Sequence, residues 1–335
     1  MSNYKEIIMK KGSGLFTLII MASMIFLVYG CKKATLPTVT TAEITAITIN
    51  SATSGGEVTA DGGDDIIEKG VCWNVTAEPK ITDSKTSNGK GVGSFTSNLT
   101  SLQPATVYAA RAYATNSAGT AYGAEFSFYT KIADIDGNQY TVVNIGTPMW
   151  MSENLKTTKY NDNSPILNVT GNADWAGQTT GAYCWYNNDM AFNKPIYGAL
   201  YNWFAVNNGK LCPAEWHVAT DADYNAMELG LGMAQAQLDL WGWRGTDQGT
   251  KMKNSTGWSA GQTGNNASGF AAIPGGYRFY QDGSFYYQNI LSYWWTATEL
   301  DATRAWYRRL DGDNAKVYKA AGEKQAGKYV RCVKN

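Results

Sequence analysis

Short β-prone runs recur between residues 36 and 131, and residues that favour turns separate them. The runs include IIEKGVCWNV, GSFTSNLTSL and FSFYT, with Gly, Asp and Asn between them. A spacing of about ten residues between strands is typical of an antiparallel β-sandwich. The pattern therefore predicts that residues 37–131 form a sandwich, and the length of 335 residues leaves room for about one further domain.

Composition narrows the class of protein. Charged residues are 17% of the chain and aromatic residues 13%, with 35 glycines, which favours a β-rich extracytoplasmic protein with long turns. Lys plus Arg equals Asp plus Glu at 28 each, so nucleic-acid binding has no electrostatic support and no nucleic-acid partner is expected. The chain also has no Gly-rich phosphate loop and no Cys-x-x-Cys metal signature.

The N-terminus predicts where the protein lies. A basic segment precedes the apolar run LFTLIIMASMIFLVYG, which is short for a membrane span and suits a signal peptide. The tetrapeptide VYGC, residues 28–31, resembles a bacterial lipobox, which implies a signal peptide over 1–30 and a lipid on Cys31. We expect an outer-membrane lipoprotein, facing the periplasm or the cell surface, with outer-membrane lipid as a partner and residues 31–36 as a tether. A plain signal peptide or a single-pass anchor is the alternative.

The predicted sandwich carries a specific motif in its second half. Leu102-x-Pro104-x-Thr106-x-Tyr108, followed by RAYATN, resembles the fibronectin type III pattern. The resemblance implies that the Tyr108 hydroxyl caps nearby backbone at the corner before a strand. Cys72 has no partner cysteine in this segment and is expected to be a small buried thiol. We expect this domain to act as a spacer.

Residues 132–335 form the second predicted domain. Asp136-Gly137 predicts a two-residue hairpin turn. Asp134, Asp136 and Asn138 have the first spacing of a calcium loop, but position six is Gln139 in place of glycine. We therefore predict a turn and no metal ligands, with a structural calcium site as the alternative.

Two helices are predicted in this domain. Tyr197, Leu200, Tyr201 and Phe204 share one helical face, and Thr220-x-x-Asp223 resembles a capping box that starts a second helix. His217, the only histidine, lies in the strand-like segment WHV and is interpreted as structural.

Seven segments of the second domain resemble, in order, the Fibrobacter succinogenes major paralogous domain. They are MWMSENLKTTKY, GAYCWYNND, YGALYNWFAV, GKLCPAEWHVATDADY, SGFAAIPGGYR, YWWTATE and YVRCVKN. The resemblance implies a C-type-lectin-like α+β fold, with two helices against a small curved antiparallel sheet. It also implies a Cys212–Cys332 disulfide. Cys184 is then expected to be a buried free thiol with no assigned role. Enzymes of the related formylglycine-generating group need a close cysteine pair, which is missing here, so neither that activity nor a cofactor is expected.

The C-terminal strands supply the candidate ligand-binding residues. Alternation along them turns one of Trp294 and Trp295 inward together with Trp306, Leu310, Val317 and Val330. The candidate ligand-binding residues are Tyr293, Trp294, Glu299, Tyr307, Arg309, Asp313 and Tyr318. Exposed aromatics with polar neighbours suit a glycan or a protein ligand. The loops around Trp241, Trp243 and Trp258 are the next place to look.

Three alternatives stay open. The tyrosines of these strands could instead fill a loop-rich core. The chain could be a glycan-active hydrolase that uses acids of the C-terminal loops, namely Glu299, Asp301, Asp311, Asp313 and Glu323. It could also be a purely structural envelope or adhesin subunit. The expected function is a non-enzymatic envelope lipoprotein that displays a ligand-binding domain on a β-sandwich stalk.

Overall fold

The computed structural model describes residues 33–259 and 263–335. The apolar N-terminal run and Cys31 lie outside these residues. Within the described ranges, no helix is long and apolar enough to cross a membrane. Most of the ordered structure is β-sheet, and the helices are short.

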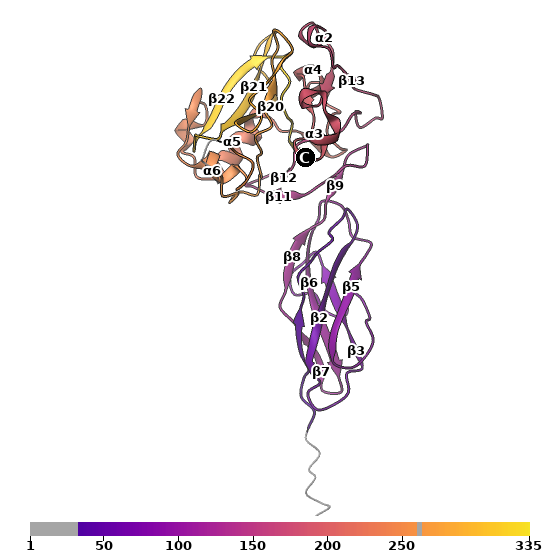
Figure 1. The fold of residues 1–335 in the computed structure, drawn as a ribbon. Helices are drawn as coiled ribbons and strands as arrows, with labels where there is room; N and C mark the ends of the chain where they lie inside the picture. Colours follow the sequence, from indigo (N-terminus) through magenta and orange to yellow (C-terminus); the bar gives the residue numbers. More distant parts are fainter. Residues whose placement is uncertain (1–32, 260–262) are drawn as a thin grey trace, which may run out of the picture.

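The first half of the described chain is a β-sandwich (Figure 1). One sheet has the order β1-β2-β5, with bounds Thr38–Thr41, Ala52–Ala60 and Gly93–Leu99. The other contains β3 Glu68–Asn74, β4 Ser84–Lys85, β6 Val107–Asn116, β7 Gly119–Tyr122 and β8 Phe126–Tyr129. Val71, Leu99 and Phe128 are among the side chains that fill the core between the two sheets.

The tyrosine corner expected in this sandwich is present. The Tyr108 hydroxyl accepts a hydrogen bond from the backbone N–H of Gln103 at 3.0 Å, while its ring stacks on Phe128. Cys72 is a buried free thiol, as predicted, and its Sγ lies 3.2 Å from the Pro79 carbonyl oxygen.

The second half combines small sheets with short helices. A two-stranded sheet pairs β9 Ile132–Ala133 with β10 Gln139–Tyr140, and a four-stranded sheet has the order β11-β12-β23-β16, with bounds Val142–Asn144, Met149–Met151, Cys332–Lys334 and Trp216–Val218. A three-stranded sheet joins β13 Leu167–Asn168, β14 Ala182–Cys184 and β15 Leu200–Tyr201. The largest sheet has the order β17-β22-β21-β20, with bounds Gly242–Arg244, Val317–Glu323, Arg304–Asp311 and Leu291–Glu299. The hairpin of β18 Tyr277–Arg278 and β19 Phe285–Tyr286 lies beside it in the chain.

The helices are α2 Asn172–Ala176, α3 Met190–Ile196, α4 Trp203–Val206, α5 Asp221–Gly230 and α6 Gln248–Met252, with 3-10 turns at Tyr186–Asn188 and Gln235–Gln237. The predicted capping box of α5 is confirmed, because the Thr220 side chain accepts from the Asp223 N–H and the Asp223 side chain accepts from the Thr220 N–H. The hairpin turn at Asp136-Gly137 is present, but its loop is longer than the predicted two residues, because Ala133 pairs with Gln139 and residues 134–138 lie between them. It joins β9 to β10, and Gly137 takes the φ of +79° that glycine accepts without strain.

The predicted helix through Tyr197, Leu200, Tyr201 and Phe204 is wrong. Helix α3 ends at Ile196, Leu200 and Tyr201 belong to β15, and α4 begins only at Trp203. Gly198 interrupts the helical pattern with a φ of +81°, and a Cβ there would lie 2.9 Å from the Cβ of Asn154. Pairing of Leu200 with Cys184 then fixes the next residues as a strand, so a long-range contact overrides the local period.

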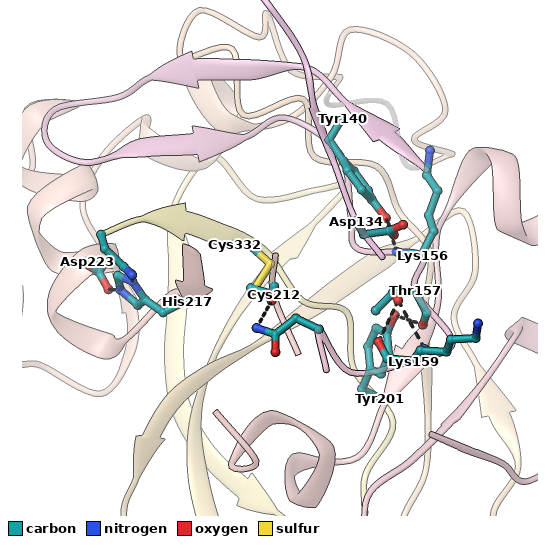
Figure 2. Close-up of a disulfide and its surroundings, with 12 residues drawn as sticks. Asp134, Tyr140, Lys156, Thr157, Lys159, Tyr201, Cys212, His217, Asp223 and Cys332 are labelled. Carbon is teal, nitrogen blue, oxygen red and sulfur yellow. Dashed lines mark hydrogen bonds and ion pairs between the residues drawn. A yellow bond between two sulfur atoms is a disulfide. The ribbon is translucent and has the colours of Figure 1, made fainter. Parts of the chain in front are cut away.

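The Cys212–Cys332 disulfide is present, with a Cα–Cα distance of 5.9 Å, and Cys184 is a buried free thiol. Figure 2 shows the bridge beside β16, whose His217 lies close to Asp223. Both ring nitrogens of His217 have protein partners, since Nδ1 lies 2.6 Å from Asn335 Oδ1 and Nε2 lies 3.1 Å from Asp223 Oδ2. This arrangement agrees with a structural histidine.

The prediction that only one of Trp294 and Trp295 turns inward is wrong, because both are completely buried. They point to opposite faces of β20, as strand neighbours must, but both faces are covered at this point. Trp294 packs with Phe270 and Leu310, while Trp295 packs with Tyr201 and Val330. A strand with two covered faces buries consecutive side chains.

Candidate ligand-binding site

The register of the largest sheet places four side chains in one row. Trp243 pairs with Tyr318, Tyr318 with Arg309, and Arg309 with Tyr293. Directly paired residues of antiparallel strands lie on the same face, so this row crosses all four strands. Tyr307, two residues before Arg309, lies on that face as well.

A chain of aromatic rings extends this row. Successive ring centroids are 5.1 Å apart from Trp243 to Tyr318, 6.4 Å from Tyr318 to Tyr307 and 5.2 Å from Tyr307 to Tyr293. The β18–β19 hairpin and the residue after it continue the chain, because the Tyr277 ring lies 4.8 Å from Tyr293, 6.0 Å from Tyr286 and 6.2 Å from Tyr287. We call the set the aromatic band: Trp243, Tyr277, Tyr286, Tyr287, Tyr293, Tyr307 and Tyr318.

The band has a half-buried centre and an exposed end. Tyr287 is 52% exposed and Tyr286 is 37% exposed, whereas the other five rings are half-buried. Burial raises the pKa of Tyr293 and Tyr277, and it raises the pKa of Tyr307 to about 12. These phenols are therefore neutral at pH 7 and can both donate and accept hydrogen bonds.

Several hydroxyls of the band have no protein partner. Among the described residues, nothing hydrogen-bonds to the hydroxyls of Tyr277, Tyr293, Tyr307 and Tyr318, and none of these oxygens is a fully buried unpartnered atom. The Tyr286 hydroxyl differs, since it donates to Asp282 Oδ2 at 2.9 Å. The half-buried hydroxyls are thus free to bind groups outside the protein.

Two cations lie among the rings. The Arg309 guanidinium is 5.6 Å from the Trp243 and Tyr293 ring centroids and 5.5 Å from that of Tyr318. Burial by itself would lower the pKa of Arg309, but its hydrogen bonds to the Asp311 carboxylate outweigh burial and raise it.

Lys328 is the second cation. Its Nζ lies 3.6 Å from the Trp295 ring centroid and 4.9 Å from that of Tyr307, and the side chain is 4% exposed. Burial lowers the pKa of Lys328 well below its usual value, and the charge of Glu323 opposes this only in part. Within the part of the chain that the structure describes, Nζ makes no hydrogen bond.

A pocket of about 170 Å³ opens between the band and Lys328. Its walls come from β18 and the residues after it, from β20, β21 and the end of β22, and from the segment after β22. They combine aromatic rings with one carboxyl group and one amine. The lining residues are Tyr277, Phe279, Tyr280, Tyr293, Tyr307, Gly322, Glu323, Ala326 and Lys328. An aromatic wall with a few convergent polar groups is the usual composition of a small-ligand site.

The structure brings together four of the seven predicted residues, Tyr293, Tyr307, Arg309 and Tyr318. The placement of Trp294 in an exposed site is wrong, because its indole faces the opposite side of β20 and donates to Asn154 Oδ1 at 2.8 Å. Glu299 and Asp313 lie near opposite ends of β21, away from the row. Glu299 binds Lys324 at 2.5 Å, and Asp313 is exposed in the turn before β22.

The sequence prediction missed Tyr277, Tyr286, Tyr287 and Lys328 as site residues, and it named Trp243 only as a fallback. The run FYY at 285–287 was the available signal, because it places three aromatic rings next to one another in a segment rich in turn residues. Nothing in the local sequence of Lys328 distinguishes it from a surface lysine.

Most acids proposed for a hydrolase have basic partners. Asp301 binds Arg304 at 2.6 Å, Asp311 binds Arg309, and Glu299 binds Lys324. In the described residues, no group of three or more His, Cys, Asp or Glu side chains could hold a metal ion. Asp134 and Asp136, the start of the calcium-like spacing, bind their own chain. Asp134 accepts from the Tyr140 hydroxyl at 2.5 Å, and Asp136 accepts from the Thr158 N–H at 2.7 Å.

Comparisons with known proteins agree with the motif order. The family model described as the Fibrobacter succinogenes major domain matches residues 143–334. No curated protein matches the chain. Among solved structures, the sensor domain of the anti-sigma factor RsgI4 from Pseudobacteroides cellulosolvens is similar, with 15% identity, 29% of this chain and 95% of that chain covered, and a TM-score of 0.23. The fibronectin type III domain of human fibronectin type III domain containing protein 3 is similar at 15% identity, with coverages of 31% and 91% and a TM-score of 0.21.

Proposed function

Because the chain belongs to the family of the Fibrobacter succinogenes major domain, we propose that it is a cell-envelope lipoprotein that presents a ligand-binding domain on a stalk. In this proposal the stalk is fibronectin type III-like, the binding domain is C-type-lectin-like, and Cys31 carries the lipid that anchors the chain in the outer membrane. The aromatic band is the ligand-binding surface.

The ligand proposed for the band is a glycan. The rings follow one another at 4.8 to 6.4 Å across a sheet face, and each is an apolar surface on which a sugar ring can stack. Tyr307 and Tyr318 are nearly parallel at 23°, whereas Trp243 and Tyr293 meet their neighbours edge-on or at a tilt. The partner-free hydroxyls of Tyr277, Tyr293, Tyr307 and Tyr318 supply donors and acceptors beside those surfaces, and a glycan carries many hydroxyls to pair with them. This combination of neighbouring rings and partner-free phenol hydroxyls is the observation that carries the proposal.

The test uses a variant that keeps the packing and removes only the hydroxyls. In a Tyr293→Phe, Tyr307→Phe, Tyr318→Phe variant the rings stay, so the free energy of unfolding should change little. Each neutral hydrogen bond contributes about 0.5–1.5 kcal/mol, so binding to a glycan that engages all three should weaken by about tenfold or more. Full-length protein in a non-ionic detergent would be applied to a glycan array, and the best glycan titrated against both proteins.

Tyr140→Phe is the matched control. Its hydroxyl is buried, donates to Asp134 and accepts from the Lys156 N–H at 2.9 Å, so its loss should cost stability and leave glycan affinity unchanged. If no glycan binds, or if the triple variant binds as well as the wild type, the proposal fails for this surface. Cleavage of an arrayed glycan would favour the hydrolase alternative, and capture of a protein ligand by the band would replace the glycan.

A further inference from the structure

Arg331 is a buried arginine whose donors are only partly used. It is 1% exposed and lies just before β23, beside the disulfide cysteine. Its Nε donates to Asn154 Oδ1 at 2.7 Å, and Nη1 donates to the carbonyl oxygens of Met151 at 3.0 Å and Phe270 at 2.8 Å. Nη2 donates to no described residue, and it is not among the fully buried unpartnered atoms, so it retains contact with solvent.

Each of the other fully buried arginines of the described chain either binds a carboxylate or uses all of its nitrogens as hydrogen-bond donors. Arg244 and Arg308 both bind the Glu228 carboxylate. Arg278 has no carboxylate, but each of its three nitrogens donates, with Nη2 shared among Thr170, Gly171 and Asn172. Arg331 differs from all three, because no carboxylate accepts a hydrogen bond from its buried guanidinium and one nitrogen stays open, while the charge of Glu153 attracts it without an ion pair. A buried charge that is only partly compensated is costly, so a group that could bind it directly gains a strong contact.

A second pocket, separate from the aromatic band, borders Arg331. Arg331 lines a pocket of about 350 Å³ whose walls include Ser152, Glu153, Tyr197, Thr256 and Ile273. The pocket lies on the Trp294 side of β20, whereas the band lies on the other face. Trp294 is linked to Arg331 through a shared acceptor, because its indole N–H and Arg331 Nε both donate to Asn154 Oδ1.

We infer that this pocket is a second binding site, in which the Nη2 group of Arg331 receives a carboxylate of a small ligand. The guanidinium is preorganised, since three hydrogen bonds and a stack on Phe270 at 4.3 Å fix its plane. A charge-assisted hydrogen bond from such a donor is stronger than a neutral one. Glu153 on the wall favours a singly charged carboxylate over a phosphate dianion, because like charges repel across a poorly solvated pocket.

The experiment compares two probes of the same shape. Saturation-transfer NMR on the full chain in deuterated detergent would measure binding of acetate and of its neutral analogue acetamide. Acetate should bind, and acetamide should bind about tenfold more weakly, since only the charged probe gains the charge-assisted bond. Inorganic phosphate should bind more weakly than acetate. As a competitor it should therefore displace acetate only when its concentration exceeds that of acetate.

Four variants locate the site without disturbing Arg331. Thr256 and Ser255 are both exposed, but only Thr256 lines the pocket. Thr256→Trp should therefore abolish acetate binding, and Ser255→Trp should leave it unchanged. Glu153→Gln removes the repelling charge and should tighten acetate binding by about threefold. Tyr293→Phe, on the aromatic band, should have no effect, which keeps this site distinct from the glycan surface.

The inference is overturned by several results. Equal binding of acetate and acetamide, equal binding to the two tryptophan variants, or weaker acetate binding in Glu153→Gln would each contradict it. Loss of acetate binding in Tyr293→Phe would assign the carboxylate to the band, and tighter binding of phosphate than of acetate would overturn the ligand class.

Discussion

At the scale of single residues, Lys328 shows how the aromatic site opposes stability. Its ammonium faces the rings of Trp295, Tyr307 and Tyr293 at 3.6, 4.9 and 5.8 Å, and a desolvated cation–π contact contributes about 2 kcal/mol. Burial of the charge acts in the opposite direction. The lowered pKa of Lys328 indicates that the neutral amine suits this environment better than the ammonium.

Replacement of this lysine by methionine should therefore stabilise the protein at neutral pH. Because the folded-state pKa of Lys328 is below that of the unfolded chain, the unfolded chain binds more protons between the two values, and wild-type stability rises with pH in that window. Below the folded pKa the full penalty applies. Lys328→Met should raise the free energy of unfolding by about 1 kcal/mol or more at pH 7, and the gain should shrink as the pH approaches the pKa of a free lysine.

Urea denaturation at pH 7 and pH 10 would measure both effects. Lys324→Met is the control, because the Lys324 ammonium binds Glu299 at 2.5 Å and the Ala302 carbonyl at 2.9 Å, so its removal should not stabilise. A less stable Lys328→Met protein would show that the cation–π contacts outweigh the burial of the charge.

At the scale of elements, sequence motifs correctly predicted the features that depend on interactions between residues close together in the chain. The capping box of α5, the WHV strand and the turn at Asp136-Gly137 depend on residues within a few positions of one another, and all three appear in the structure. The helix predicted from Tyr197 to Phe204 failed because β14, which is paired through distant residues, holds Leu200 and Tyr201 in a strand.

The candidate site was partly predictable for the same reason. Tyr293, Tyr307, Arg309 and Tyr318 lie on consecutive strands, so alternation and hairpin pairing place them on one face. Trp243 joins them only through β17, which pairs with β22 across a long stretch of chain. The burial of both Trp294 and Trp295 depends on other segments that cover the two faces of β20. The alternation of residues within the strand does not indicate whether a face is covered.

The Cys212–Cys332 disulfide gives a prediction at this scale. It joins the segment before β16 to β23 across a sequence separation of 120, and β23 is a central strand of its sheet. In the loop-entropy model a bridge of this span contributes about 4 to 5 kcal/mol, a large part of the total stability of an ordinary domain. A Cys212→Ala, Cys332→Ala variant should therefore be close to unfolding at 37 °C.

Thermal and urea melts of this variant should match those of wild-type protein reduced with dithiothreitol. Cys184→Ala is the control, since it removes a buried free thiol and closes no loop. Its melting temperature should fall by much less, and it should stay sensitive to the reductant. A double variant as stable as the wild type would contradict the contribution of the bridge.

At the scale of the whole molecule, the order of the parts suits a display protein. Figure 1 shows the described chain entering the sandwich at one end and leaving it at the other, where β9 begins the second half. The connection is short and fixed, because Thr130 is fully buried and the Lys131 N–H donates to the Thr48 carbonyl at 2.9 Å. Asn144 also donates to the Tyr129 hydroxyl at 2.9 Å across the junction. The sandwich thus separates its N-terminal end from the aromatic band by its own length.

This geometry supports a function only if the N-terminal end is anchored, and the last prediction tests that anchor. In the sequence, Cys31 precedes the first described residue, Lys33, by two positions. Cells grown with a labelled fatty acid should yield labelled wild-type protein and unlabelled Cys31→Ala protein, because the lipobox cysteine is the proposed acceptor. Cys72→Ala should stay labelled, since Cys72 is buried in the sandwich. Equal labelling of the wild type and of Cys31→Ala would contradict the proposed lipid anchor.

Once the anchor is established, protease treatment of intact cells would decide the orientation, because a surface-facing protein is degraded and a periplasmic one is protected.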